Sequence, residues 1–289
     1  GVELNKRQQL DEAREQFARA VTLGPGVHKY HQAFFITNLA LRRGPQALAF
    51  YQKLASQHPG SAAVHYWLGR WHLQGQSLEA AEREFQEAGR LAPDDEHAWI
   101  SLGHVYLRMG RDDEALAAYR RANELAPRVA VVHAGLGTVH FNRKEFGQAE
   151  AEYNDALMLD PSLTEARYNL SLIYEQRGDI PQAVKQWRQL LEEDPNESRA
   201  RERLARTYLA GGQYEDAVRE YTMLSEVRQG SSEVFFALGE AQVLYAATLA
   251  DRDQQRQLRE AAIEAFQRTL ELDPEHAQAR RYLARLTRS

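Results

Sequence analysis

Residues 96–127 read EHAWISLGHVYLRMGRDDEALAAYRRANELAP and end on a proline that recurs at a fixed interval along the chain. Six prolines are each separated by 34 residues, namely Pro25, Pro59, Pro93, Pro127, Pro161 and Pro195. A fixed period of about 20 to 50 residues is typical of a solenoid, in which each repeat packs only on its neighbours. The sequence therefore predicts a repeat protein over most of its length.

Each repeat is expected to contain two helices. In the quoted stretch the first helix is predicted at about 96–109 and the second at about 112–125, with Gly110 breaking the chain between them. Gly178 and Gly212 occupy the same position in later repeats. One position of the second helix is alanine in all eight repeats, which permits close helix packing: Ala13, Ala47, Ala81, Ala115, Ala149, Ala183, Ala217 and Ala262.

These residues match a known repeat. Trp99, Leu102, Gly103, Tyr106, Ala115, Tyr119 and Pro127 reproduce the pattern W-x2-L-G-x2-Y, A-x3-F, P, with tyrosine in place of phenylalanine. The chain resembles the tetratricopeptide-repeat family over nearly its whole length. The resemblance implies an all-α, right-handed superhelical solenoid of antiparallel helix pairs. It also implies a non-catalytic scaffold that binds a peptide or a helical segment of a partner protein.

The repeat boundaries predict one solenoid over residues 1–289. A half repeat spans 1–27, full repeats begin at residues 28, 62, 96, 130, 164 and 198, and a terminal capping helix occupies 277–289. The chain begins within the first helix of a repeat, so we expect a fragment of a longer protein. Phe35 stands where a small residue is expected, which predicts irregular packing of the helix that begins near His28.

The repeat at 232–276 contains an 11-residue insertion between residues 243 and 261. Eleven residues correspond to about three helical turns, so two longer helices joined by a polar tip near residues 250–254 are expected. A tolerated loop insertion and a docking projection are both open interpretations of this segment.

Composition argues against several other functions. The net charge is −5, so no basic field attracts nucleic acid, and the absence of cysteine excludes disulfides and thiolate chemistry. No apolar run is long enough to insert into a membrane. We expect a soluble protein. The absence of a visible export signal favours the cytoplasm over the periplasm, but the truncated start leaves localisation open.

No catalytic motif, cofactor site or metal site is predicted. His65, His72, His133 and His140 occupy the positions of Trp99 and Tyr106 in the repeat, which indicates packing roles. His97 and His104 lie seven residues apart on one helix, or roughly 10 Å along its axis, too far to chelate one ion together.

The resemblance places the ligand groove on the first helix of each repeat, at positions two, five, nine and twelve. The central groove residues would be aromatic and aliphatic, and an arginine cluster would follow downstream. Such a groove suits a segment with apolar anchors and an acidic flank. The candidate contact residues are Tyr66, Arg70, His97, Ile100, His104, Phe141, Tyr168, Asn169, Leu172, Arg199, Arg203, Arg206 and Phe236.

Two specialised subfamilies can be compared directly. The clamp that grips acidic chaperone tails would need lysine and asparagine where this chain has Ala134 and Thr138, although Asn169, Arg199 and Arg203 match. The asparagine ladder of the sugar-transferase superhelix is also absent. The sequence therefore does not predict either function. Two alternatives stay open: a self-assembling structural scaffold that forms homo-oligomers, and the targeting or regulatory arm of a larger enzyme or of a secretion or assembly complex.

Overall fold

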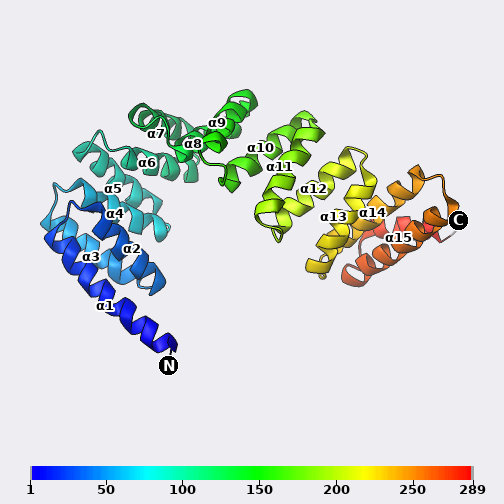
Figure 1. Cartoon of the computed structure of the whole chain (residues 1–289), viewed down its shortest axis with the longest axis horizontal. Coiled ribbons are helices and arrows are strands. Elements are labelled where there is room, and N and C mark those ends of the chain that lie inside the picture. Colours follow the sequence, from blue (N-terminus) through cyan, green and yellow to red (C-terminus); the bar gives the residue numbers. More distant parts are fainter. Residues whose placement is uncertain (1, 288–289) are drawn as a thin grey trace. The chain divides into compact units, whose positions relative to one another are not determined.

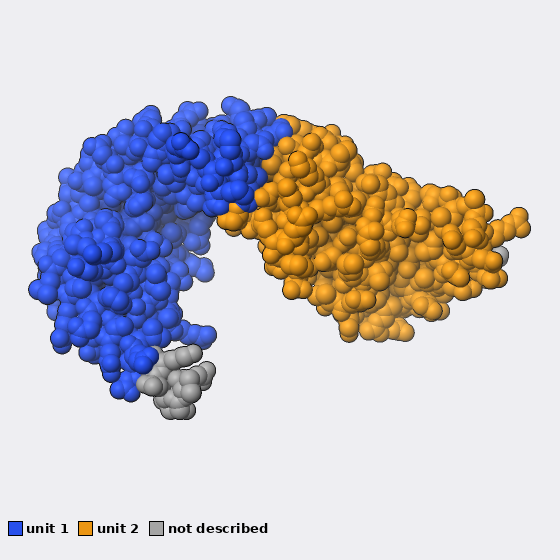
Figure 2. Space-filling view, in the orientation of Figure 1, with its two compact units in different colours: residues 1–161 blue, residues 162–289 orange. Residues whose placement is uncertain are grey.

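The computed structural model describes residues 2–287, with side chains from residue 7 onward. The described residues form sixteen α-helices in two compact units, residues 1–161 and 162–289 (Figures 1 and 2). The helices of the first unit are α1 Val2–Leu23, α2 His28–Ala40, α3 Gly44–Gln57, α4 Ala62–Gln74, α5 Leu78–Leu91, α6 Glu96–Arg108, α7 Asp112–Leu125, α8 Ala130–Asn142 and α9 Phe146–Leu159. Those of the second are α10 Thr164–Arg177, α11 Ile180–Glu193, α12 Ser198–Ala210, α13 Tyr214–Val227, α14 Ser232–Thr248, α15 Arg252–Leu272 and α16 Ala277–Leu286.

The helices pair as the sequence predicts. We call the first helix of each repeat its A helix (α2, α4, α6, α8, α10, α12 and α14) and the second its B helix (α3, α5, α7, α9, α11, α13 and α15). The all-α solenoid of antiparallel helix pairs is confirmed. The two units divide at Pro161, so one continuous solenoid over the whole chain stays a prediction.

The turn between the two helices of a repeat contains a left-handed residue at a fixed position. Its φ angle is +72°, +71° and +73° at Gly110, Gly178 and Gly212. Glycine adopts this conformation without a steric penalty, which explains the predicted break. Three non-glycine residues hold the same conformation at the same repeat position: Arg42 at +55°, Gln76 at +59° and Lys144 at +62°.

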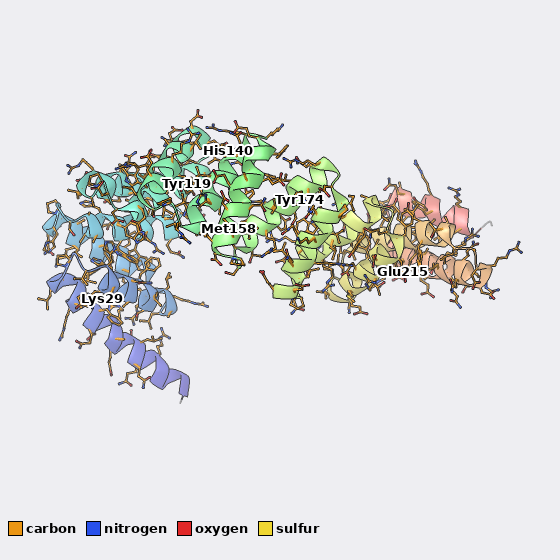
Figure 3. All side chains as sticks on the ribbon, turned by 45° about the horizontal axis from the view of Figure 1, so that its top comes forward. Lys29, Tyr119, His140, Met158, Tyr174 and Glu215 are labelled. Carbon is orange, nitrogen blue, oxygen red and sulfur yellow. The ribbon has the colours of Figure 1, made fainter. Side chains whose placement is uncertain are left out.

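Glycine in the A helices permits close packing on the aromatic residue of the B helix. A Cβ atom on Gly103 would lie 2.7 Å from the ring of Tyr119, and one on Gly135 would lie 2.3 Å from the same ring. The Tyr119 ring therefore packs against the A helix of its own repeat and against that of the next repeat. Figure 3 labels Tyr119 among the side chains of unit 1. Because both approaches are closer than a side-chain carbon allows, the small residues at these positions are steric requirements.

Two features of the amino-terminal repeats depart from the regular pattern. Phe35 replaces the small residue and packs on Trp71, with ring centroids 4.5 Å apart, and α2 approaches α3 less closely than the other A helices approach their B helices. The expected irregular packing is thus observed. In addition, α1 is one continuous helix where the half repeat predicted the end of an A helix followed by a B helix. Gln8 stands in the turn position there and is helical, although Gln76 adopts the left-handed turn at the same position of a later repeat, so the residue type alone does not decide the break.

The insertion lengthens both helices of its repeat, as expected. Helix α14 has 17 residues against 13 in α12, and α15 has 21 against 14 in α13. The connection is short, and the Asp251 carboxylate accepts hydrogen bonds from the backbone N–H groups of Asp253 and Gln254 at the start of α15. The insertion is therefore an extension of the helical hairpin rather than a long loop. A docking role for its tip stays a prediction.

Helix α16 covers the apolar end of α15. The ring of Tyr282 stacks on Phe266 with centroids 4.9 Å apart, while Arg280, Arg281 and Arg285 are exposed. An apolar inner side and a charged outer side are the features of a solenoid cap, and they agree with the predicted capping helix over its described residues.

Candidate partner-binding groove

The packing of unit 1 shows which side of its helix stack is the inner side. The A helices α6 and α8 of successive repeats pack directly on each other. The corresponding B helices α5 and α7 are separated by a cavity of about 570 Å³ lined by Gln86, Gly89, Arg90, Pro93, Trp99, Leu102, Tyr106, Glu114, Ala117 and Ala118. Helices crowd on the inner side of a curved stack and separate on the outer side. The A helices therefore line the inner face of unit 1, as the family resemblance implied.

Exposed aliphatic side chains lie on this inner face. Ile36 is 57% exposed, Leu39 is 38% exposed and Val131 is 39% exposed. Ile36 and Leu39 hold positions nine and twelve of the repeat that begins at residue 28. They are not among the predicted site residues because the groove positions were assigned only from residue 62 onward. The same spacing, applied one repeat earlier, finds them.

The predicted contacts Tyr66 and His97 lie together on two A helices. Their ring centroids are 6.2 Å apart, and the His28 ring lies 5.8 Å from Tyr66 and 6.4 Å from His97. Tyr66 is half-buried and also packs on Phe85, whereas His97 is exposed. This part of the inner face is therefore an aromatic and imidazole surface contributed by three successive repeats.

The other predicted contacts of unit 1 are partly occupied by packing. The Arg70 guanidinium lies over the rings of Phe35 and Trp67, 4.7 and 4.9 Å from their centroids. Ile100 packs against the core, and the ring of Phe141 lies 5.8 Å from that of Phe146. His104 is exposed, with its ring 5.8 Å from that of Tyr119. Arg70 is thus held flat on aromatic rings by cation–π contacts.

In unit 2, the A helices α12 and α14 enclose a cavity of about 610 Å³. Five of its lining residues hold predicted groove positions: Glu202, Arg206, Leu209, Glu233 and Glu240. Ala210, Tyr221, Arg228, Ser231, Val234 and Ala237 complete the lining. Of the predicted site residues, the structure brings only Arg206 into this cavity. Arg203 lines a smaller one of about 200 Å³ with Glu175 and Thr207, and Arg206 borders that cavity too.

The predicted arginine cluster is largely compensated by carboxylates. Arg203 lies 3.5 Å from Glu175, and Arg199 lies 3.5 Å from Glu197 while its guanidinium covers the Tyr168 ring. Arg206 is exposed, and Glu202, Glu233 and Glu240 line the same cavity. The surface is therefore a mixed-charge groove rather than an unopposed positive patch.

The remaining predicted contacts are half-buried. Tyr168 packs edge-on against Trp187 with centroids 4.9 Å apart, and Asn169 and Leu172 are also half-buried. Phe236 lies among Phe266, His276 and Tyr282 in the carboxy-terminal core cluster. Much of its ring thus stabilises the end of the solenoid, and its role as a ligand contact stays a prediction.

Two of the histidines assigned to packing positions form a repeating hydrogen-bonded latch. His65 Nδ1 lies 2.7 Å from Glu84 Oε2, and its Nε2 lies 3.1 Å from the Pro59 carbonyl oxygen. His133 makes the same contacts with Glu152 and the carbonyl of Pro127, at 2.8 and 3.1 Å. Arginine serves the same purpose in unit 2, where Arg201 donates to Glu220 and to the Pro195 carbonyl. The latch joins the A helix to its B helix and to the preceding loop.

The latch also raises the pKa of its histidines. The hydrogen bond from Glu84 raises the pKa of His65, against the opposing effect of burial. Burial lowers the pKa of His133, but the combined effects of Glu152 and the Pro127 carbonyl raise it above the ordinary value. The repeat pattern indicated the positions of the histidines but not their partners. A carboxylate recurs nineteen residues after the A-helix residue of the latch, at Glu84, Glu152 and Glu220, and this spacing indicates the pairing.

The repeat that begins at residue 96 lacks the carboxylate of the latch. Trp99 donates its indole N–H to the Pro93 carbonyl oxygen at 3.1 Å, but Ala118 stands where Glu84, Glu152 and Glu220 stand in three other repeats. The gap that results is part of the cavity between α5 and α7.

Within the described part of the chain, no helix combines the length and apolar character needed to cross a membrane.

Comparisons with known proteins agree with this architecture. Three family models, each described as tetratricopeptide repeat, match residues 38–102 and 176–239, residues 97–129, and residues 248–287. A search of curated protein sequences finds no match.

Similar solved structures include that of the APC/C hetero-tetramer Cut9–Hcn1, with a TM-score of 0.60, 16% identity and coverage of 98% of this chain and 54% of the other. Pseudomonas aeruginosa pilF gives a TM-score of 0.60 at 18% identity over 78% of this chain and 97% of the other. YrrB, a TPR protein with an unusual peptide-binding site, gives a TM-score of 0.58 at 21% identity over 68% of this chain and 96% of the other. This chain spans about half of the Cut9–Hcn1 chain, and identities this low show the fold alone. The fixed spacing, the paired helices and the three matching family models together place the chain in the tetratricopeptide-repeat family.

Proposed function

We propose that the chain is a non-catalytic scaffold whose A helices bind a peptide or helical segment of a partner protein. The observation that carries the proposal is the cavity of about 610 Å³ between α12 and α14, because five predicted groove positions line it. A volume of this size lies in the range of clefts that bury small ligands or a few side chains. Its apolar wall, formed by Leu209, Val234 and Ala237, suits an apolar anchor residue of the partner.

The charge of the cavity suggests what would flank that anchor. Arg206 is exposed at the cavity, and Arg199 is exposed beside Tyr168. An acidic residue of the partner next to its anchor would pair with Arg206, because a guanidinium binds a carboxylate through two parallel hydrogen bonds. A basic flank would instead meet Glu233 and Glu240. The proposal commits to the acidic flank, which the experiment below tests directly.

Unit 1 offers apolar contacts of its own on the inner face. Ile36, Leu39 and Val131 are 38 to 57% exposed there, so burying the remaining surface of each in an interface would contribute about 0.5 to 1.5 kcal/mol. YrrB, whose reported structure has an unusual peptide-binding site, provides a structural precedent for a peptide ligand on this fold.

The test begins with a random peptide library displayed on phage and selected against the whole chain. The affinity of each selected peptide is then measured by fluorescence anisotropy for the wild type and for two variants. Ala237→Trp fills the cavity, and Arg206→Glu reverses its exposed positive charge. Arg259→Glu makes the same charge change on α15, outside the cavity. Circular dichroism verifies that all variants are folded.

We expect selected peptides with an apolar residue next to an acidic one. Ala237→Trp and Arg206→Glu should each weaken their binding at least tenfold, and Arg259→Glu should leave it within twofold. Peptides that keep full affinity for both cavity variants would contradict binding in this groove. Selection of peptides with a basic flank would contradict the assigned charge preference.

A further inference from the structure

Two clusters of histidine and carboxylate side chains in unit 1 bring potential metal ligands within 4.8 Å of one another: His133 with Glu152 and Asp155, and His97 with Asp95 and Glu96. The first belongs to the latch, where His133 uses one ring nitrogen for Glu152 and the other for the Pro127 carbonyl. Its imidazole is therefore occupied by the contacts that hold the repeat together. The second cluster is different.

A second imidazole faces the Asp95 cluster from another repeat. His28 Nε2, in the first turn of α2, lies 3.9 Å from Asp95 Oδ2, which precedes α6. The other oxygen of this carboxylate, Oδ1, accepts a hydrogen bond from the backbone N–H of His97 at 3.0 Å, and this contact fixes the orientation of the carboxylate. His97 Nδ1 lies 3.5 Å from Glu96 Oε1. Ligand atoms of Asp95, Glu96 and His97 thus lie within 4.8 Å of one another, and His28 adds a second imidazole beside the Asp95 carboxylate.

These separations suit a shared cation better than direct hydrogen bonds. The 3.9 Å between His28 Nε2 and Asp95 Oδ2 exceeds the normal hydrogen-bond range. Two ligand atoms that bind one zinc ion at about 2.0 to 2.1 Å lie roughly 3.3 to 4 Å apart. Both imidazoles are exposed, His28 by 42% and His97 by 55%. The side chains have room to turn toward a common ion.

We propose that His28, Asp95, Glu96 and His97 form a Zn²⁺-binding site that joins the first and third A helices of unit 1. Mixed imidazole and carboxylate ligands favour zinc over calcium or magnesium, which prefer oxygen ligands alone. The Tyr66 ring lies beneath the site, 5.8 Å from the His28 ring and 6.2 Å from the His97 ring. A bound ion would therefore link α2 to α6 across α4 and restrain the curvature of these repeats.

The sequence spacing concealed this site. His28 and His97 are two repeats apart, so no spacing along a single helix indicates that their side chains meet. The inward curvature of the A helices brings the first turns of α2 and α6 together. The site is open to solvent, so we expect a single ion with affinity in the micromolar range rather than a closed structural site.

The experiment uses the whole chain freed of metal by chelation. Zn²⁺ binding is measured by isothermal titration calorimetry, and Co²⁺ is added as a spectroscopic probe because its visible absorption reports tetrahedral coordination. Thermal unfolding is followed with and without Zn²⁺. His28→Gln and His97→Gln each remove one imidazole ligand. His58→Gln is the matched control, since His58 lies outside both clusters. Glu152→Gln tests the alternative cluster.

We expect the wild type to bind one ion at this site, with a Co²⁺ spectrum of tetrahedral type and a higher Tm in Zn²⁺. His28→Gln and His97→Gln should each weaken binding at least tenfold and abolish the rise in Tm, and His58→Gln should behave as wild type. Absence of binding, or binding that persists in the His28→Gln, His97→Gln double variant, would overturn the proposal. Loss of binding in Glu152→Gln alone would assign the ion to the His133 cluster and also overturn it. No peptide is used, so the result is independent of the proposed groove.

Discussion

His65 Nδ1 and Glu84 Oε2 lie 2.7 Å apart, and this contact between an A helix and its B helix recurs 68 residues later between His133 and Glu152. Each histidine also reaches the carbonyl oxygen of the proline that ends the preceding repeat. A single side chain thus connects three elements of the repeat. The consequences of removing it can be measured.

Glu84→Gln should destabilise the protein by about 1 to 2 kcal/mol at pH 6, because an amide oxygen can still accept from His65 but lacks the negative charge that strengthens the hydrogen bond to the protonated imidazole. The folded-state pKa of His65 is raised, so its contribution is fully present below the unfolded value of 6.5 and is lost as the pH rises through the folded value. The difference in unfolding free energy between the wild type and Glu84→Gln should therefore shrink at high pH. Urea unfolding at pH 6 and pH 9 measures it.

Glu79→Gln provides the control for this variant, because Glu79 is an exposed carboxylate on the same helix. An equal loss of stability in Glu79→Gln and Glu84→Gln would show that net charge, and not the latch, is responsible.

His31 should produce the opposite pH dependence. Burial lowers its pKa to about 4, with the Pro25 carbonyl opposing this shift and His28 adding to it. The folded protein therefore holds His31 neutral, and stability is lost as the pH falls from 6.5 toward 4, by up to roughly 3 kcal/mol. The loss of unfolding free energy between pH 7 and pH 4.5, measured by urea unfolding, should therefore be smaller in His31→Gln than in the wild type. A variant with the same loss as wild type would contradict the assignment.

Lys144→Gly should raise the free energy of unfolding by about 1 kcal/mol, because Lys144 has a φ of +62° that glycine adopts without steric cost. The reverse change at the equivalent position of the preceding repeat, Gly110→Ala, should lower stability by about 1 to 2 kcal/mol. Thermal unfolding of the two variants tests whether the left-handed turn has the same conformational preference in both repeats. If both substitutions raised, or both lowered, the free energy of unfolding, the two turns would not share this conformational preference.

Gly135→Ala should destabilise unit 1 by at least about 1 to 3 kcal/mol, because the added Cβ would lie 2.3 Å from the Tyr119 ring. Gly60→Ala is the matched control, since nothing lies within 4 Å of a Cβ at that position. Chemical denaturation should show a large loss for Gly135→Ala and little change for Gly60→Ala. If Tyr119→Leu restores much of the stability of Gly135→Ala, the ring is the steric partner.

Local sequence predicted most of the fold. Residues within one or two repeats predicted three features of the fold. These are the turns at Gly110, Gly178 and Gly212, the lengthening of both helices that flank Asp251, and the loose packing of the helix that contains Phe35. The continuous helix α1 was not predicted, because glutamine stands at the turn position of both α1 and the repeat that begins at residue 62, yet only Gln76 forms the left-handed turn. The identities of the groove positions followed from the repeat register, but their packing did not. Arg70 lies on aromatic rings and Phe236 belongs largely to a core.

The sequence by itself determined the repeat length, the helix pairs and the small residues that let them pack, because these depend on contacts between neighbouring residues in a periodic chain. Only the tertiary structure decided which distant side chains meet. The cavity between α12 and α14 and the approach of His28 to His97 depend on small rotations between successive helix pairs. Those rotations arise from side-chain packing over several repeats and accumulate along each unit, so no single repeat encodes them.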